Sequence, residues 1–223
     1  MSHGKQFTLY THKAGPNGWK VAYFLTELGL TYESIYLDFN KEEHKAPAYT
    51  GKYNPNGRIP TLIDHTNNDF ILWESNAILT YLADKYDTEH KFSAITADDQ
   101  YRQLQWLLFQ ASGQGPYFGQ AAWFIFYHPE KVPSALERYH NEIKRVFKVL
   151  DGELAKREWL VGDKYSIADL SFISWNVLGT GPLAPPDYDI AKEVPHFWAW
   201  FQKMQARPAI AKVHAEKEAV NKQ

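Results

Sequence analysis

PNGRIPTL at residues 55–62 and FILWESNAI at residues 70–78 set the pattern for the first half of this chain. The first segment is a loop that enters a short apolar strand through the Ile59-Pro60 bond. Because proline has no backbone N–H, Pro60 belongs at the first residue or at the edge of a strand. The backbone just before it, around Ile59, is therefore left free to pair with a peptide.

The second segment is a strand that turns into a helix at Glu74-Ser75. Ser75 is a good N-cap residue for the apolar-periodic run that follows it. A helix start offers unpaired amides and a positive dipole end, which favour a carboxylate. The carboxylate of Glu74 suits an ammonium group. One short element could therefore hold both charged ends of an amino-acid head group.

Taken in order, the Asn-Pro-x-Gly-x-Ile-Pro-x-Leu run, the strand and the Glu-Ser helix start resemble the glutathione-binding half of the cytosolic glutathione transferases. The resemblance implies that the bond before Pro60 is cis and that Ile59 pairs, backbone to backbone, with the cysteinyl unit of glutathione. It also implies that Glu74 and Ser75 hold the γ-glutamyl group. Each piece alone can be an ordinary turn, strand or capped helix, so the inference depends on their order and context.

Composition and charge exclude several classes of protein. The 223 residues suit one large or two small domains, and the formal net charge of −2 argues against binding nucleic acid through phosphate contacts. No segment approaches the roughly 20 apolar residues that a membrane span needs. The first residues lack the apolar region of a signal peptide, so we expect a cytoplasmic protein.

The chain contains no cysteine, which excludes disulfides and zinc–thiolate sites. Any thiol chemistry must therefore use a thiol carried by the ligand. A thioredoxin or glutaredoxin needs its own cysteine in the loop after the first strand, whereas this chain has Ala14-Gly15-Pro16-Asn17 there. No spacing of His, Asp and Glu resembles a metal site. The cofactor that the resemblance implies is glutathione, acting as co-substrate.

Hydrophobic periodicity predicts a thioredoxin-like α/β domain over residues 1–86, with the element order βαβαββα and a mixed sheet. Strands are expected at residues 7–10, 32–37, 61–63 and 71–72, helices at 19–28 and 76–85, and a short irregular helix at 41–52. The polar residues 87–96 are expected to form a linker.

No strand is expected in residues 97–223, which predicts an all-α second domain. The family resemblance implies that the two domains together form a glutathione transferase fold. Helices are expected at residues 101–111, 117–127, 133–154, 194–205 and 208–219, with an interruption near Gly113 and Pro116. Ser166 and Asp169 form a capping box before a buried helix. Asp169 is therefore expected to be structural and not catalytic.

The resemblance is sharper for one branch of the family. AGPNG at 14–18, LDFN at 37–40, EHKAP at 43–47 and GDK at 162–164 resemble the fungal branch related to a yeast nitrogen-catabolite regulator that can form a prion. The sequence lacks that regulator's Asn/Gln-rich N-terminal extension and its long insertion before the GDK segment. These differences favour the enzyme relatives over a regulatory or prion role.

The group that contacts the reactive sulfur is expected in the loop after the first strand. Asn17 matches the asparagine that contacts the glutathione sulfur in the fungal branch, and its amide can donate one hydrogen bond to a thiolate. Asn17 could instead serve only as an N-cap. Tyr10 and Thr11 are the alternative hydroxyls at the strand end, and Thr11 could assist catalysis.

Two further binding regions follow from the resemblance. His44 matches a histidine that reaches the glycyl carboxylate of glutathione, and Arg58 adds charge or orients the loop, although a basic cluster here is by default a solvated face. The second-substrate pocket is expected in the helical domain, although most aromatic residues at helical spacing belong to a core. Its candidate residues are Tyr117, Trp123, Phe124 and Tyr127, with Trp175 and Asn176 behind them.

These expectations combine into a cytoplasmic, homodimeric glutathione transferase. An asparagine-type site activates a thiol weakly, so we predict disulfide exchange and peroxide reduction beside conjugation of small electrophiles, with a role in detoxification. The expected partners are glutathione and a small hydrophobic electrophile, disulfide or peroxide, without nucleic acid or membrane. The alternatives are a glutathione-binding or regulatory relative that does not turn over and an interaction protein with a decayed site.

Overall fold

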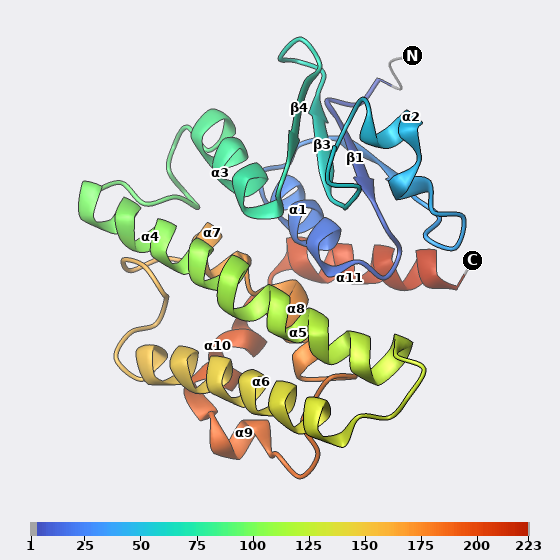
Figure 1. The fold of residues 1–223 in the computed structure, drawn as a ribbon. Coiled ribbons are helices and arrows are strands. Elements are labelled where there is room, and N and C mark those ends of the chain that lie inside the picture. Colours follow the sequence, from blue (N-terminus) through green and yellow to red (C-terminus); the bar gives the residue numbers. More distant parts are fainter. Residues whose placement is uncertain (1–3, 223) are drawn as a thin grey trace. The chain divides into compact units, whose positions relative to one another are not determined.

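The computed structural model of this protein describes residues 4–222. By their contacts, these residues form two compact units. The first unit extends to Glu89 and also contains the chain from Ala206 onward, and the second unit runs from His90 to Gln205. Figure 1 shows the helices and strands of both units.

The first unit contains a four-stranded sheet in the order β2-β1-β3-β4. Its strands are β1 (Phe7–Thr11), β2 (Tyr32–Tyr36), β3 (Thr61–Asp64) and β4 (Phe70–Trp73). β1 runs parallel to β2 and antiparallel to β3, which in turn is antiparallel to β4. A parallel pair needs a crossover, and α1 (Pro16–Glu27) supplies it. The thioredoxin-like arrangement with a mixed sheet is therefore confirmed.

Three more helices complete this unit: α2 (Pro47–Thr50), which follows a 3₁₀ turn at Glu43–Lys45, α3 (Ser75–Tyr86) and α11 (Pro208–Asn221). α1 lies between α3 and α11 (Figure 1). Arg207 reinforces the contact with α11, because its guanidinium donates hydrogen bonds of 2.6 and 3.1 Å to Glu27 at the end of α1. α11 therefore packs with the sheet unit, although the sequence pattern groups it with the other late helices.

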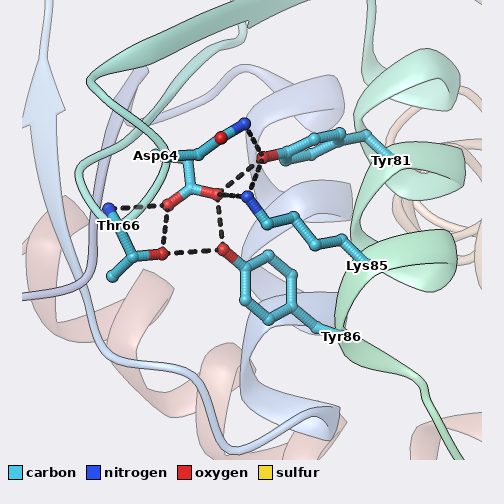
Figure 2. Close-up of polar contacts among 6 residues, drawn as sticks. Asp64, Thr66, Tyr81, Lys85 and Tyr86 are labelled. Atoms are coloured by element: carbon cyan, nitrogen blue, oxygen red, sulfur yellow. Dashed lines mark hydrogen bonds and ion pairs between the residues drawn. The ribbon is translucent and has the colours of Figure 1, made fainter.

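A buried carboxylate ties the turn after β3 to the end of α3 (Figure 2). Asp64, only 1% exposed, accepts hydrogen bonds from the backbone amide and hydroxyl of Thr66 and from the hydroxyls of Tyr81 and Tyr86. Lys85 Nζ lies 3.4 Å from the same carboxylate. Burial acts to raise the pKa of Asp64, but the hydrogen bonds from Tyr81, Tyr86 and Thr66 outweigh it and hold the pKa below its usual value.

The second unit, residues 90–205, contains helices joined by loops and no strand. Its helices are α4 (Ala97–Phe109), α5 (Gly115–Ala122), α6 (Pro133–Leu154), α7 (Ile167–Leu170), α8 (Ile173–Gly179), α9 (Ile190–Glu193) and α10 (Pro195–Gln205). The interruption expected near Pro116 takes the form of a π-helical segment at Gln110–Gln114, and α5 follows it directly. Pro116 is tolerated because it lies in the first turn of α5, where a missing N–H breaks no intrahelical bond.

The start of α7 is closed by its own side chains, as the sequence predicts. Ser166 Oγ accepts the amide of Ala168 at 3.3 Å, and Asp169 accepts both the amide and the hydroxyl of Ser166 at 3.0 Å. The fully buried Asp169 also accepts the Leu160 amide and Trp200 Nε1, each at 2.9 Å. Asp169 therefore joins three segments of the helical unit, which is the structural role expected for it.

Candidate functional site

The loop before β3 presents an unpaired piece of backbone. The Ile59-Pro60 peptide bond is cis. The carbonyl of Arg58 just before it is held by the Tyr49 hydroxyl at 2.8 Å and by the Asn54 side-chain amide at 2.9 Å. Within residues 4–222, no hydrogen bond engages the backbone N–H or C=O of Ile59. A fixed loop with an open backbone position can accept an extended peptide by strand-like pairing.

The start of α3 differs from the prediction in its N-cap. Glu74 is the N-cap, Ser75 is the first helical residue, and no side chain caps the helix. The prediction that Ser75 is the N-cap is therefore wrong, because Glu74 makes the turn with its own backbone at φ 71°, in the left-handed region. Such strain in a residue other than glycine, of order 1 kcal/mol, is frequent at binding sites. The exposed Glu74 thus stands beside a first turn without a side-chain cap.

A lysine that the sequence analysis did not single out lies beneath this helix start. Lys20 on α1 is 1% exposed, and its Nζ donates hydrogen bonds of 2.9 Å to Ser75 Oγ and to Asn76 Oδ1. Burial lowers the pKa of Lys20 to about 7, while the charge of Glu74 acts in the opposite direction. The sequence contained a signal for this residue: Lys20 precedes Phe24 by four positions, which places a charge on the apolar face of α1.

The loop between β1 and α1 brings Asn17 close to the cis-proline segment. Gly15 is the N-cap of α1 and Asn17 is its second residue, so Asn17 does not serve as the N-cap. Gly15 packs so tightly on Ile59 that a methyl group added there would come within 2.8 Å of Ile59 Cδ1. The half-buried side chain of Asn17 therefore belongs to a helix turn that begins beside the side chain of Ile59.

Thr11 lies deeper than the other candidates. A methyl group added at Gly18 would lie 1.7 Å from Thr11 Oγ1, so α1 can approach the end of β1 only because residue 18 is glycine. Thr11 Oγ1 is buried and has no hydrogen-bond partner among the residues that the structure describes. The alternative hydroxyl, that of Tyr10, belongs to a ring 4.6 Å from the ring of Tyr53, and burial raises the pKa of Tyr10.

His44 lies in the 3₁₀ turn before α2 and is 8% exposed. Its ring stacks on Phe39 with 3.9 Å between centroids, and its Nδ1 is buried without a hydrogen-bond partner in the described part of the chain. Burial first, and then the charges of Lys45 and Arg58, lowers the pKa of His44, so the free imidazole is neutral at pH 7. A methyl group added at Gly57 would lie 3.2 Å from the His44 carbonyl, which places the loop carrying the exposed Arg58 against this turn.

These contacts link most of the predicted glutathione-binding residues within the first unit. Gly15 joins the start of α1 to Ile59, Lys20 joins α1 to the start of α3, and Gly57 joins the Arg58 loop to His44. We refer to the region formed by Asn17, His44, Arg58, Ile59, Pro60, Glu74 and Ser75 as the α1–α3 site. Thr11 is buried beneath α1 and lies outside it.

The predicted second-substrate residues lie in the helical unit and have unequal exposure. Trp123 and Tyr127 are exposed, and their rings stack with 6.1 Å between centroids. Phe124 stacks on Tyr139 of α6 at 5.6 Å and so contributes to packing within this unit. Tyr117 on α5 is half-buried, and Trp175 and Asn176 behind this set are buried.

Residues 4–222 contain neither a metal-binding cluster nor a membrane-spanning helix. Among residues 4–222, no group of three or more His, Cys, Asp and Glu side chains is arranged to hold a metal ion. Within the same residues, no helix combines the length and the apolar character needed to cross a membrane.

Comparison with known families identifies both halves of the chain. The model of the glutathione S-transferase N-terminal domain matches residues 5–84, and the model of the glutathione S-transferase C-terminal domain matches residues 116–208. Glutathione S-transferase 2 of Schizosaccharomyces pombe is 53% identical over 220 residues, which are 94% of this chain and 94% of that protein.

Solved structures agree with this result. The glutathione transferase URE2P6 from Phanerochaete chrysosporium, in complex with oxidized glutathione, is 62% identical, with a TM-score of 0.95 over 99% of this chain and 100% of its own. Ure2p5 from the same organism, cocrystallized with 1-(S-glutathionyl)-2,4-dinitrobenzene, is 51% identical, with a TM-score of 0.92 over 100% of this chain and 99% of its own. The chain belongs to the glutathione S-transferase family and is similar to its fungal, Ure2-type members.

Proposed function

We propose that this glutathione transferase binds glutathione, or its disulfide, at the α1–α3 site and uses the glutathione thiolate for disulfide exchange, peroxide reduction and conjugation to small electrophiles. The observation that carries the proposal is the open backbone of Ile59 in the loop before β3. The side chain of Ile59 packs against Gly15 at the start of α1. Neither α1 nor α3 has a side-chain cap, so their first amides are available to an anion. The chain has no cysteine, so the reacting sulfur must belong to the ligand.

Each end of the tripeptide has a matching group in this proposal. The cysteinyl backbone pairs with Ile59 beside Pro60, the γ-glutamyl ammonium meets the carboxylate of Glu74, and the γ-glutamyl carboxylate meets Ser75 and the first amides of α3. The glycyl carboxylate approaches His44 and Arg58. An anion beside His44 stabilises the imidazolium form, and this offsets the burial that lowers its pKa in the free protein.

Asn17 is proposed to contact the sulfur. It lies in the first turn of α1, where an amide N–H of its side chain and the positive end of the helix both favour a thiolate over a thiol. One neutral hydrogen bond activates a thiol only modestly, which is why exchange and reduction are proposed beside conjugation. Thr11 has a supporting role, since its buried side chain sets how closely α1 approaches β1 at Gly18.

The second substrate is proposed to meet aromatic side chains of the helical unit. Trp123 and Tyr127 present stacked, exposed rings, with Tyr117 and Phe124 nearby in sequence, and such rings suit a small hydrophobic electrophile or disulfide. The two similar structures support these reactions, because one holds oxidized glutathione and the other a glutathionyl-dinitrobenzene conjugate. A role in detoxification would follow from this chemistry.

We further propose that the protein works as a homodimer in the cytoplasm. Tyr101, Leu104 and Leu108 are exposed at three- and four-residue spacing and so form an apolar stripe on α4. Reduced glutathione is kept abundant in the cytoplasm, where it is available as a co-substrate. Size-exclusion chromatography with light scattering checks the dimer: a mass near 25.8 kDa at micromolar concentration would contradict it, since that is the mass of one chain.

The proposed function is tested by calorimetry and by turnover on the same preparation. Titration with reduced and oxidised glutathione is expected to give heat, and a small mixed disulfide with reduced glutathione is expected to be reduced faster than without protein. Binding without turnover of the disulfide, a peroxide or a dinitrobenzene electrophile would favour a non-catalytic ligand-binding or regulatory role. No heat with either form of the tripeptide at millimolar concentration would overturn the proposal altogether.

Asn17→Ala separates catalysis from binding. We expect turnover to fall about tenfold, because one hydrogen bond to the thiolate is lost, and the dissociation constant of oxidised glutathione to change by about twofold or less. Asn221→Ala, at the far end of α11, is the matched control and should leave both quantities unchanged. Equal turnover in Asn17→Ala and the unsubstituted protein would remove Asn17 from the catalytic role.

A further inference from the structure

The buried lysine beneath α3 determines which way a neighbouring hydroxyl can point its proton. A protonated lysine amine has three donors and no acceptor. Since Lys20 Nζ lies 2.9 Å from Ser75 Oγ and from Asn76 Oδ1, both oxygens act as acceptors toward it. The hydroxyl proton of Ser75 is then available to donate outward, toward whatever lies at the start of α3.

The electrostatic setting of Lys20 favours an anion at the same place. Its charge is buried at the positive end of the α3 dipole, where a cation is disfavoured, and no side chain caps that helix. A carboxylate placed at the first turn of α3 would be attracted by the helix end and by the ammonium together. The cost of burying Lys20 thus falls when the site is filled.

We propose that Lys20 is a positioning residue of the α1–α3 site: it holds Ser75 as a hydrogen-bond donor to the γ-glutamyl carboxylate of glutathione and supplies the balancing positive charge from below. This inference rests on the proposed function. Lys20 acts through Ser75 and Asn76 and not by direct contact with the reacting sulfur.

A proton-linked signature follows from this arrangement. In the free protein the pKa of Lys20 is lowered to about 7 by burial, so near pH 8 most molecules carry the neutral amine. A bound carboxylate raises that pKa, and binding near pH 8 therefore takes up a proton, whereas near pH 6 the amine is already charged and takes up almost none.

Proton uptake near pH 8 can be assigned to Lys20 because the other ionisable groups nearby contribute little to it. Glu74 on α3 is the charged group that opposes the lowering of the Lys20 pKa. On the other elements that contact α1, Tyr10 of β1 faces Tyr53, and His214 of α11 faces Tyr23. The pKa values of His44 and His12, in the same unit, lie below the usual 6.5. These imidazoles therefore contribute little to proton uptake near pH 8 unless a ligand raises their pKa values strongly.

Calorimetry with S-methylglutathione measures the proton directly. This ligand keeps both carboxylates and the ammonium but has no thiol to ionise. Titrations near pH 8 in two buffers with different ionisation heats give the number of protons taken up. We expect up to about one proton for the unsubstituted protein near pH 8. Near pH 6 the contribution of Lys20 is expected to vanish, and any uptake that remains there belongs to His44 and should be the same in Lys20→Met. Binding without uptake near pH 8 would overturn the inference and leave the proposed function standing, whereas no binding would overturn the proposed function.

Variants of Lys20 assign the proton to this residue. Lys20→Met is expected to lose the uptake and to raise the dissociation constant by on the order of tenfold to a hundredfold, the value of a charge-assisted hydrogen bond. Lys20→Arg keeps the charge at every pH, so it should restore affinity without proton uptake. Lys217→Met, which removes a partly buried lysine of α11, is the matched control and should behave like the unsubstituted protein.

The outcome of the variants is read together with circular dichroism, which checks that each one is folded. Folded Lys20→Met that still takes up a proton near pH 8, or that binds S-methylglutathione with unchanged affinity, would overturn the assignment. If Lys20→Met does not fold, Lys20→Arg and the pH dependence of the unsubstituted protein still test whether Lys20 takes up the proton. Proton uptake near pH 8 that persists in Lys20→Arg would contradict the inference.

Discussion

The starts of α7 and α3 each have a buried ionisable side chain beside them, but the two charges have opposite signs. At α7, the carboxylate of Asp169 has the sign that a helix start favours, and four donors from Leu160, Ser166 and Trp200 point at it. At α3, the ammonium of Lys20 has the sign that a helix start disfavours. It donates to the neutral oxygens of Ser75 and Asn76, and the charge of Glu74 acts in its favour.

We propose that the difference separates a structural helix start from a ligand-binding one. The α7 start is closed by a capping box, so nothing further is needed there for stability. The α3 start has a strained N-cap at Glu74, no capping side chain and an unfavourable charge below it. Such unfavourable features are typical of a site where a bound ligand supplies the missing cap and the opposite charge. The three predictions below test whether stability resides at one start and binding at the other.

Asp169→Ala is expected to have the largest effect. It leaves the donors of Leu160, Ser166 and Trp200 unpaired in the core, so the free energy of unfolding should fall by about 3–5 kcal/mol. Chemical denaturation monitored by tryptophan fluorescence measures it. Ser166→Ala removes the cap acceptor and one of the four donors to Asp169, and it should cost about 1–2 kcal/mol. A loss below about 1 kcal/mol in Asp169→Ala would mean that the α7 start is not the stabilising one.

Ser75→Ala is the corresponding change at α3 and should act on binding. The lost hydrogen bond to a carboxylate is expected to raise the dissociation constant of glutathione about tenfold, with a change in unfolding free energy of about 1 kcal/mol or less. Calorimetry and denaturation on the same sample measure both. Thr80→Ala on the same helix, whose hydroxyl donates to the Asn76 carbonyl at 3.0 Å, is the control and should leave affinity unchanged. A stability loss larger than the affinity loss in Ser75→Ala would erase the distinction between the two starts.

The pH dependence of stability gives the smallest effect. The pKa of Lys20 is about 7 in the folded, ligand-free protein and 10.5 ordinarily, so between these values the unfolded chain binds more protons. The free energy of unfolding should therefore rise with pH relative to that of Lys20→Met, by about 1 kcal/mol from about pH 7 to about pH 8. Denaturation curves at both pH values measure it. A difference that stays constant or falls as pH rises would show that Lys20 is not a buried, partly neutral amine.

Features that depend on neighbours in the sequence were predictable. The capping box at α7 joins residues three positions apart, and α6 runs from Pro133 to Leu154 as its apolar period and starting proline indicate. The order of strands and helices in the first unit follows from the same local patterns. The cis bond at Pro60 was implied by the family resemblance and not by the local sequence.

Features that depend on distant contacts were not predictable from patterns. Lys20 was missed because its partners, Ser75 and Asn76, lie more than fifty positions away in the sequence. The N-cap of α3 was misplaced by one residue because the left-handed backbone of Glu74 contradicts the usual preference for Ser as a cap. The depth of Thr11 depends on its contact with Gly18 across a strand–helix packing, which no short motif encodes. Lys20 and Thr11 are placed by such long-range contacts, and the local sequence pattern does not show them.

The hydrogen bonds around Asp64 fix the C-terminal end of α3. Asp64 accepts hydrogen bonds from Thr66, Tyr81 and Tyr86, which hold the last turns of α3 against the sheet (Figure 2). The first turn, which we propose to bind the γ-glutamyl carboxylate, begins at Ser75 at the other end of the same helix. A redesign of that first turn to bind a sulfonate or a phosphate can therefore leave the hydrogen bonds around Asp64 intact. Substitutions in the first turn could then change which anion is bound, one residue at a time, without disturbing the packing of the rest of the helix.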